Sequence, residues 1–322
     1  MLNIACKMNK PLTESPLISI GITCFNAEPT IERAIKSALT QDWPEIEIII
    51  VDDCSTDRSW EILARLSSVD PRVKVYRHNI NKGYPAALNT ILAHACGEFV
   101  AIFDDDDDNV PDRLKAQVKR VADYEQKSGS ELVLCYSNRD VIKGGQNNVD
   151  HVAQAIGRNA PEPHGQEVAD YVFGTHATPG KTWGIFGSCT LMARRTSFDM
   201  IGPFDESFRR CAEWDYAVRA ALIGAHFIAV DRSLTTQYKT SGSYKSGKIP
   251  LKYALLLRKK HRSYLSPRGL YQASRFIARS NFYGNKHQYV RGYFYRTIAY
   301  ICSLELLSRF LHRRFSIRKS KT

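Results

Sequence analysis

The sequence has no closely spaced pair of cysteines and no long hydrophobic run. Its eight cysteines are scattered through 322 residues without a C-x-x-C pair, which excludes the common zinc-ribbon and dithiol patterns and indicates a reducing compartment. The most apolar stretch, residues 293–311, is interrupted by Arg296, Glu305 and Arg309, so it falls short of the roughly 18 apolar residues that a membrane-spanning helix needs. The N-terminal residues lack the apolar core and cleavage site of a signal peptide. We therefore expect a cytoplasmic protein.

Acidic residues are almost absent from the last quarter of the chain. Residues 251–322 contain 17 Lys and Arg and a single acid, Glu305, a net charge of +16, so the first 250 residues carry −4 of the total of +12. Leucines and aromatic residues alternate with these basic residues, and we predict three helices, at 251–264, 269–279 and 287–313. Basic amphipathic helices with aromatic residues suit an anionic membrane surface, so we predict that 251–322 places the protein peripherally at the inner face of the cell membrane. One alternative is a helical appendage with solvated arginines. The other is binding to nucleic acid, which we do not expect.

The first half of the chain alternates short apolar segments with helical patterns. Such an alternation predicts βαβ units and an α/β fold whose mostly parallel central sheet is flanked by helices. In open α/β sheets ligands bind beyond the carboxyl ends of the strands. Thr23, Asp53 and Asp104 all fall at or directly after predicted strand ends. The predicted strands are 17–23, 45–51, 73–76 and 98–103, and the predicted helices are 30–39, 59–66 and 85–94.

The second half of the chain is more irregular. We predict helices at 113–124 and 215–223 and strands at 132–136 and 182–193. The segments 143–163 and 235–248 are rich in Gly, Asn, Pro, Ser and Lys and are predicted to be loops.

Five consecutive aspartates, Asp104 to Asp108, directly follow the predicted buried strand 98–103. Adjacent carboxylates repel one another, so a chain that holds them at a strand end usually offsets the cost with a cation or with many hydrogen bonds. One or two carboxylates together with substrate phosphates are the usual ligands of Mg²⁺ or Mn²⁺. A solvated acidic loop, or a helix start that complements the helix dipole, is the alternative. The buried strand before the run favours the metal site.

Three further motifs carry polar groups suited to a nucleotide or to proton transfer. Asp53, in Val51-Asp52-Asp53, could accept a hydrogen bond from a base or a ribose, although a turn with Asp57 as helix cap explains the segment equally well. Lys82 and Gly83 enter a predicted helix, where an anion would fit. Two acids at another helix start could include a general base or could simply interact with the dipole. These two acids are Glu213 and Asp215.

Together these motifs resemble the inverting family-2 glycosyltransferases of GT-A fold, which include enzymes of bacterial polysaccharide and lipopolysaccharide synthesis. The resemblance covers residues 16–237. The motifs that carry it occur in the family's order: T-x-x-N, V-D-D-x-S-T-D, N-x-G-x-x-x-A-x-N, F-D-x-D-D-x-x-x-P-x-R-L, G-x-F-D-E and E-x-D-x-x-x-R. It implies transfer of a sugar, with inversion and the help of Mn²⁺ or Mg²⁺, from a nucleotide-sugar donor to an acceptor hydroxyl. A UDP-sugar is the favoured donor, and the implied acceptor is a glycan or a lipid-linked glycan of a bacterial surface.

The resemblance also implies a division of the chain. Residues 1–15 form a tail, and 16–245 form the catalytic domain. Within that domain 16–110 hold the nucleotide and 111–245 face the acceptor. Residues 246–322 form the basic helical region.

The resemblance assigns roles to individual residues. The nucleotide base lies against Thr23, Phe25 and Asp53, and Lys82, Asp104 and Asp105 also belong to the donor site. The register set by Pro111-Asp112-Arg113-Leu114 places the D-x-D motif on Asp104 and Asp106, with Asp106 as the metal ligand and Asp107 next in line. The side chains of Asp105 and Asp108 are expected to be solvated. Glu213 is the expected catalytic base and Asp215 the alternative.

The chain departs from the family pattern in several places. Cys54 replaces the usual glycine, which is acceptable only if that turn needs no positive φ. Residues 235–242 contain no histidine near the metal, which leaves a third protein ligand unassigned. Trp183 and Trp214 are expected at the acceptor pocket. Lys239 and Lys245 lie in a segment that is either a lid over the donor or a solvated basic loop. A nucleotidyltransferase and a non-catalytic nucleotide- or sugar-binding relative are the alternative functions.

Overall fold

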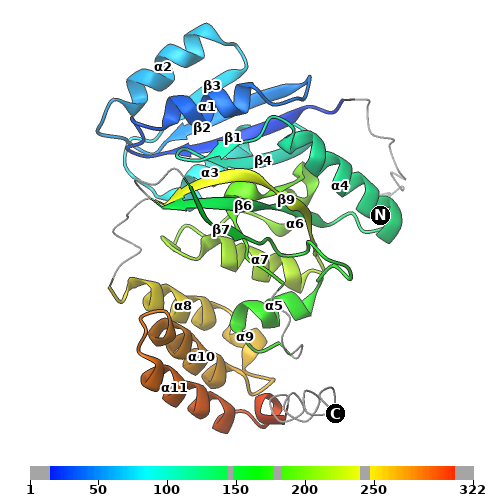
Figure 1. Ribbon diagram of the computed structural model, residues 1–322, viewed down its shortest axis with the longest axis vertical. Coiled ribbons are helices and arrows are strands. Elements are labelled where there is room, and N and C mark those ends of the chain that lie inside the picture. The colour runs from blue at the N-terminus through cyan, green and yellow to red at the C-terminus, as the bar shows by residue number, and fades with distance from the viewer. Residues whose placement is uncertain (1–14, 144–147, 177–182, 240–246, 309–322) are drawn as a thin grey trace, which may run out of the picture.

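The computed structural model describes residues 15–143, 148–176, 183–239 and 247–308. Its first half is a parallel sheet in which helices connect the strands (Figure 1). β1 pairs with both β2 and β4, and β2 pairs with β3, all in parallel. The elements are β1 (Ile18–Cys24), α1 (Ile31–Leu39), β2 (Ile46–Asp52), α2 (Ser59–Val69), β3 (Val73–Arg77), α3 (Tyr84–His94) and β4 (Phe99–Asp104).

The second half extends the sheet with mixed pairing. In the order β3-β2-β1-β4-β8-β6-β9-β5, β8 is antiparallel to both β4 and β6, β6 and β9 are parallel, and β5 is antiparallel to β9. β7 pairs with β6 off this path. The elements are β5 (Asp108–Asn109), α4 (Arg113–Ser128), β6 (Val133–Lys143), β7 (Val149–Ala153), α5 (Gln166–Phe173), a 3₁₀ turn η1 (Ser188–Thr190), β8 (Met192–Arg194), α6 (Arg195–Ile201), α7 (Ala212–Leu222) and β9 (His226–Lys239).

Several predicted elements of this half were wrong. The predicted loop 143–163 contains β7, and the predicted loop 235–248 begins inside β9, which runs to Lys239. Among the described residues of the predicted strand 182–193, Ile185 forms an isolated bridge, Ser188–Thr190 form the 3₁₀ turn, and only the end joins the sheet as β8. β7 is exposed along most of its length, and residues 235–239 of β9 are mainly polar. The hydrophobic pattern that reveals a buried strand is therefore missing.

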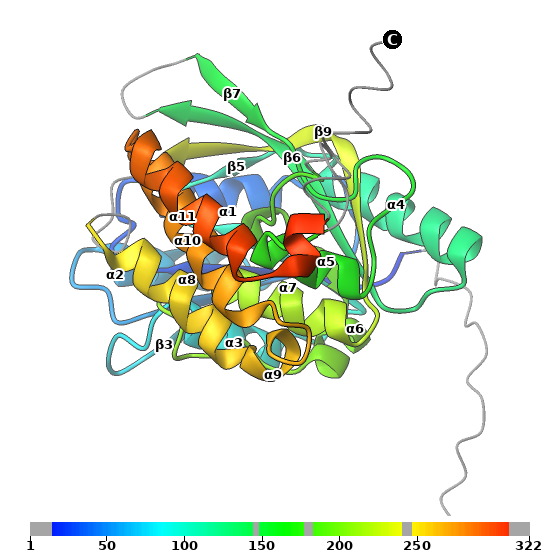
Figure 2. The same cartoon turned by 90° about the horizontal axis from the view of Figure 1, so that it is seen from below.

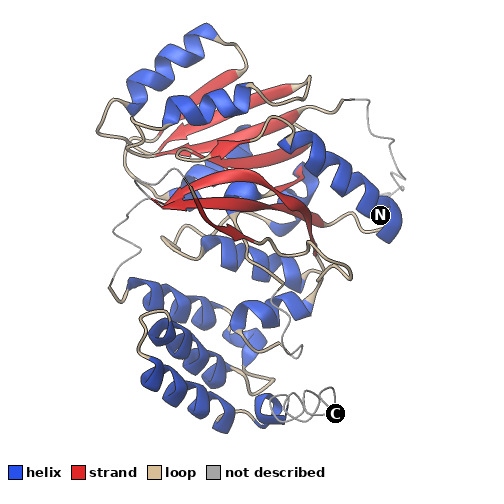
Figure 3. Ribbon diagram, in the orientation of Figure 1, coloured by secondary structure: helices blue, strands red, loops and turns tan. Residues whose placement is uncertain are grey.

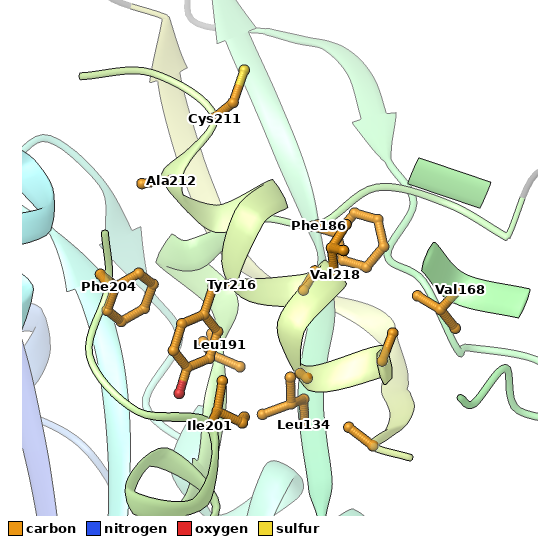
Figure 4. Packing of buried hydrophobic residues seen from close by; sticks show 14 of the residues in the cluster. Leu134, Val168, Phe186, Leu191, Ile201, Phe204, Cys211, Ala212, Tyr216 and Val218 are labelled. Atoms are coloured by element: carbon orange, nitrogen blue, oxygen red, sulfur yellow. The ribbon is translucent and has the colours of Figure 1, made fainter. Parts of the chain in front are cut away.

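The strands are buried because helices cover both faces of the sheet (Figure 3). Alternate residues of one strand point to opposite sides. Ile48 and Ile50 of β2 join one hydrophobic cluster with α1, α2 and α4, whereas Ile49 and Val51 join another with α3 and α7. In the second cluster Tyr216 of α7 stacks on Phe204 with ring centroids 4.1 Å apart (Figure 4). This packing fixes the start of α7, where Glu213 and Asp215 lie.

The described residues after β9 include the helices α8 (Ile249–Lys260), α9 (Arg262–Leu265), α10 (Tyr271–Gly284) and α11 (Tyr289–Ile301). Leu257, Leu270 and Ile277 belong to the same hydrophobic cluster as α5 and α7, so the basic region is packed into the core of the molecule. Arg268 also forms a two-pronged ion pair with Asp170 of α5, at 2.6 and 2.8 Å. Seen from below, α8, α10 and α11 lie over α5 and α7 (Figure 2). In the part of the chain described, no helix is long and apolar enough to cross a bilayer.

Candidate functional site

Three of the predicted site segments meet at the carboxyl edge of the parallel strands. Thr23 is the register partner of Asp104 across β1 and β4, and Cys24 is the partner of Asp52 across β1 and β2. The N–H of Asp53 donates to the carbonyl of Cys24 at 2.8 Å. Parallel pairing thus brings together motifs that lie about 80 residues apart in the sequence.

Asp105 and Asp108, which were expected to be solvated, are partly exposed and also bond to protein groups. Asp105 accepts a hydrogen bond from the backbone N–H of Phe25 at 3.1 Å, which ties the run to the loop after β1. Asp108 forms an ion pair with Arg33 at 3.0 Å and accepts a hydrogen bond from the hydroxyl of Tyr238, also at 3.0 Å. These three contacts hold the run in place.

The remaining carboxylates include two oxygens that are buried without a partner. Asp107 has no exposed surface, and its Oδ1 accepts from the N–H of Tyr238 at 3.3 Å. Its Oδ2 and the Oδ1 of Asp104 have no hydrogen-bond partner. Ligand atoms of Asp104, Asp107 and Cys189 all lie within 4.8 Å of one another. Unpaired buried carboxylate oxygens are costly, and a hard cation is the usual group that stabilises them.

This grouping differs from the pair that the sequence register indicated. Asp104 belongs to the cluster, but its neighbour there is Asp107 rather than Asp106. The backbone carbonyl of Asp106 accepts a hydrogen bond from Arg33 at 2.6 Å. Burial raises the pKa of the Cys189 thiol well above its ordinary value, and a protonated thiol is a poor ligand for Mg²⁺ or Mn²⁺. Asp106 as metal ligand stays a prediction.

The acidic run holds its protons tightly. Burial, followed by the charge of Asp106, raises the pKa of Asp104 to about 6 and that of Asp105 to about 8. Burial and the charge of Asp104 raise the pKa of Asp107 to about 8. Because these pKa values exceed those of the unfolded chain, the run destabilises the folded, metal-free protein increasingly as the pH rises from about 4 to 8. A bound cation would remove this penalty.

Arg113, from the Pro-Asp-Arg-Leu segment, lies fully buried beneath the run. Its guanidinium donates to Asn109 Oδ1 at 2.5 Å and to the carbonyl of Ile102 at 2.9 Å, and it stacks over the ring of Phe103 at 4.1 Å. Burial lowers its pKa to about 10. The arginine therefore supports the loop from within and stays charged at neutral pH.

Asp53 joins the end of β2 to the start of α3. Its Oδ1 contacts Nδ1 of His78 at 2.7 Å and accepts from the N–H of Lys82 at 2.8 Å, while its Oδ2 accepts from the N–H of Gly83 at 2.6 Å. Cys54, next to it, has a φ of +64°. The condition under which cysteine could replace glycine there is therefore not met, and the turn is strained. Recognition of a base by Asp53 stays a prediction.

The two acids at the start of α7 have different surroundings. Asp215 is fully buried, and its oxygens contact Arg219 at 3.0 Å, Lys260 at 2.8 Å and His261 at 2.8 Å. Despite its burial, bonds to His261 and Lys260 leave its pKa below the ordinary value. Glu213 instead has its pKa raised by burial, as suits a group that takes up a proton.

Glu213 lines a cleft of about 710 Å³ between α7 and the C-terminal helices. Trp214 also lines it and is 37% exposed, and its place at an acceptor pocket stays a prediction. Trp183 does not line this cleft; it packs on Tyr171 with ring centroids 5.2 Å apart. Lys239 is exposed at the end of β9, and Lys245 lies outside the described residues.

Sequence reasoning missed Arg139 of β6. Its positive charge lowers the pKa of both Asp104 and Glu213, so it lies within electrostatic reach of the acidic run and of the cleft. Its Nη1 contacts the Cys189 sulfur at 3.4 Å, and its Nε has no hydrogen-bond partner. No motif marks this arginine, because the strand that carries it was predicted to end at 136.

A mixed α/β sheet whose parallel strands end in acidic groups is the architecture in which ligands commonly bind at the carboxyl edge of the strands. Residues 19–197 match the family model "Glycosyl transferase family 2", which is more than half of the chain. The chain belongs to glycosyltransferase family 2, as its motifs predicted.

Curated relatives resemble the first part of the chain. It is 33% identical over 136 residues to the succinoglycan biosynthesis protein ExoO of Rhizobium meliloti, covering 42% of this chain and 37% of the relative. It is 38% identical over 102 residues to "UDP-Glc:alpha-D-GlcNAc-diphosphoundecaprenol beta-1,3-glucosyltransferase WfaP" of Escherichia coli, covering 32% of this chain and 40% of the relative. The matched part spans about two fifths of these relatives.

Solved structures match almost the whole chain. The crystal structure of S. aureus TarS 1-349 in complex with UDP-GlcNAc superimposes with a TM-score of 0.59 at 19% identity, covering 94% of this chain and 92% of that chain. At this identity the likeness concerns the fold. It confirms the predicted GT-A architecture with C-terminal helices.

Proposed function

We propose that the protein transfers a sugar from a nucleotide-sugar to an acceptor hydroxyl, with inversion at the anomeric carbon. The observation that carries the proposal is the pairing of two sites. One is the group of unpartnered carboxylate oxygens of Asp104 and Asp107 at the strand ends, and the other is a cleft that contains Glu213. A UDP-sugar is the favoured donor, because TarS was crystallised with UDP-GlcNAc and WfaP is named for UDP-Glc. The names of WfaP, which include GlcNAc-diphosphoundecaprenol, and of the succinoglycan biosynthesis protein ExoO favour a bacterial surface glycan or its lipid-linked precursor as acceptor.

The donor site consists of the loops after β1, β2 and β4. Phe25 is 48% exposed beside the acidic run and can stack on a base, and the backbone around Asp53 and Lys82 can bond to the base and the ribose. Asp104 with Asp107, and Asp106 as the motif indicates, would hold Mn²⁺ or Mg²⁺. A bound cation supplies charge stabilisation for the departing nucleoside diphosphate.

Glu213 acts as the base in this proposal. Its carboxylate accepts the proton of the acceptor hydroxyl while the oxygen attacks the anomeric carbon, and the bond to the diphosphate breaks on the opposite side. Burial raises the pKa of Glu213, which strengthens it as a proton acceptor. Asp215 suits this role less, because Arg219, Lys260 and His261 already occupy its oxygens.

A donor screen tests this function. Purified protein is incubated with UDP-, GDP- and dTDP-sugars in the presence of Mn²⁺ or Mg²⁺, with and without mixed glycan acceptors, and release of the nucleoside diphosphate is measured. We expect release from a UDP-sugar that depends on the metal. A chain that released pyrophosphate, or bound the sugars without turnover, would be a nucleotidyltransferase or a non-catalytic relative, and the proposal would fail.

We also propose that the C-terminal helices rest on an anionic membrane surface. In Figure 1, α11 is the outermost of these helices, at the end of the molecule opposite α2. Val290, Phe294 and Ile301 follow one another on one face of α11 and are 84%, 61% and 73% exposed. The sequence 251–322 also has a large excess of basic residues, and such segments are attracted to anionic lipids.

Vesicle sedimentation tests the membrane proposal without removing the helices, because Leu257 and Ile277 are part of the core. Each exposed apolar side chain that enters the interface contributes on the order of 1–2 kcal/mol, so the double variant Val290→Ser, Phe294→Ser should bind phosphatidylglycerol vesicles at least about tenfold more weakly. Val69→Ser, on a residue of α2 that is 77% exposed, is the matched control. Binding equal to wild type, or binding that ignores lipid charge, would refute this proposal.

A further inference from the structure

The cleft that contains Glu213 is joined to a second hollow at the C-terminal helices. The second hollow, of about 390 Å³, lies between α10 and α11. Trp214, Asn281 and Asn285 line both hollows. The two therefore adjoin, and together they form a trough that leads from Glu213, past Trp214, to α11.

The outer part of the trough is positively charged. Arg296 lines it and donates to two neutral oxygens, to Ser280 Oγ at 3.2 Å and to Asn281 Oδ1 at 2.7 Å, so neither contact neutralises its charge. Lys286 lines the larger cleft, is exposed, and follows Asn285, which lines both hollows; its Nζ lies 4.7 Å above the ring of Phe282. Among the described residues that line the outer hollow there is no acidic side chain.

The walls of the trough suit a carbohydrate. Trp214 is 37% exposed and Tyr293 is 73% exposed, so both present aromatic faces on which the apolar face of a sugar ring can pack. Asn281 and Asn285 carry amide groups that can both donate to and accept from hydroxyls. A few polar groups on an aromatic surface are the usual composition of a small-molecule site.

We propose that the trough is a two-part acceptor site, in which the inner part holds the accepting sugar at Glu213 and the outer part holds an anionic group of the same acceptor against Arg296 and Lys286. The anionic group is a phosphate or a carboxylate attached beyond the accepting sugar. The proposal rests on the glycosyl transfer proposed above. It makes α10 and α11, which lie outside the segment that matches the family model, the elements that select the acceptor.

Titration calorimetry with three probes, in the presence of UDP and Mn²⁺, tests this site. The probes are N-acetylglucosamine diphosphate with a short alkyl chain, a trisaccharide that contains a uronic acid, and a neutral trisaccharide. Losing one charge-assisted hydrogen bond costs about 1.5 kcal/mol or more, which corresponds to about tenfold in Kd. Lys286→Gln and Arg296→Gln should each weaken the better anionic probe about tenfold and leave the neutral probe and UDP unchanged. Lys259→Gln removes an exposed lysine of α8 that lines neither hollow and should change nothing.

The outcomes distinguish a failure of the proposed acceptor site from a failure of the proposed glycosyl transfer. Tighter binding of the diphosphate probe identifies a phosphate-bearing acceptor, and tighter binding of the uronate probe identifies an acidic glycan. The trough proposal is overturned if the wild type binds no anionic probe more tightly than the neutral one, or if Lys286→Gln behaves like Lys259→Gln. Should the wild type fail to bind UDP in the same cell, it is the glycosyl-transfer proposal that fails.

Discussion

Replacing Glu213 by glutamine is expected to lower kcat for sugar transfer by about 10²–10⁴-fold, the usual contribution of a general base. The substitution keeps the shape of the side chain but removes its ability to take the proton of the acceptor hydroxyl. UDP binding should not change, because Glu213 lies in the cleft and outside the loops that hold the donor. The measurement is the rate of nucleotide release in the presence of acceptor.

If Glu213 is the base, the rate of sugar transfer should also depend on pH on the acidic side of the profile. Burial raises the pKa of Glu213 above the ordinary value of a glutamate, so activity should fall as the pH drops through this raised pKa, where the carboxylate becomes protonated. The Glu213→Gln variant should not show this loss of activity at low pH.

Asp215→Asn is the matched control for the base. Removing this buried charge leaves Lys260, His261 and Arg219 without their common partner. Because Lys260 and Arg219 are partly exposed, we expect a loss of about 1–3 kcal/mol in the free energy of unfolding, with transfer retained at temperatures where the variant is folded. The reverse pattern, with normal turnover in Glu213→Gln and none in folded Asp215→Asn, would assign the base to Asp215.

Neutralising carboxylates in the acidic run is expected to have the second large effect. Asp104→Asn should lower metal-dependent transfer by about 10²–10³-fold, the loss typical of one missing electrostatic contact to the transition state. Treatment with EDTA should have a similar effect, and Mn²⁺ should restore activity to the treated wild type but not to the variant.

Two further variants in the run separate the candidate ligands. The motif assigns the second ligand to Asp106, whereas the cluster of buried oxygens contains Asp107. Activity and Mn²⁺ affinity should fall together in whichever of Asp106→Asn and Asp107→Asn removes a true ligand. Asp108→Asn is the control, because Asp108 is engaged by Arg33 and Tyr238, and it should stay within a few-fold of wild type. Activity that survives both EDTA and Asp104→Asn would refute the metal site.

Sequence reasoning was strongest where hydrophobic patterns and motifs coincide. The four strands β1 to β4 are apolar segments that end in polar motifs, so both their existence and the convergence of Thr23, Asp53 and Asp104 were predictable. The end of β9, Thr235–Lys239, was predicted to be a loop because its residues are mainly polar, although it pairs with β6. A strand segment of this kind lacks the alternation of apolar and polar residues by which a strand is predicted from the sequence.

The side-chain environments could not be predicted from the sequence. Five adjacent aspartates look equivalent in one dimension, yet Asp105 bonds to Phe25, Asp108 to Arg33, and Asp107 is fully buried. These differences come from contacts with residues about 70 to 130 positions away. The setting of Asp215 likewise depends on Lys260 and His261, which belong to a region whose charge had suggested a surface role.

The central claim is that the acidic run holds a cation for the diphosphate of the donor, and calorimetry of UDP binding with and without Mn²⁺ tests it most directly. The account predicts that Mn²⁺ tightens UDP binding by at least about tenfold, equivalent to about 1.4 kcal/mol. It also predicts that this gain is larger at pH 8 than at pH 6, because protons compete with the metal for Asp104 and Asp107, whose pKa values are raised to about 6 and about 8. Equal UDP affinity in Mn²⁺ and in EDTA at both pH values would contradict it.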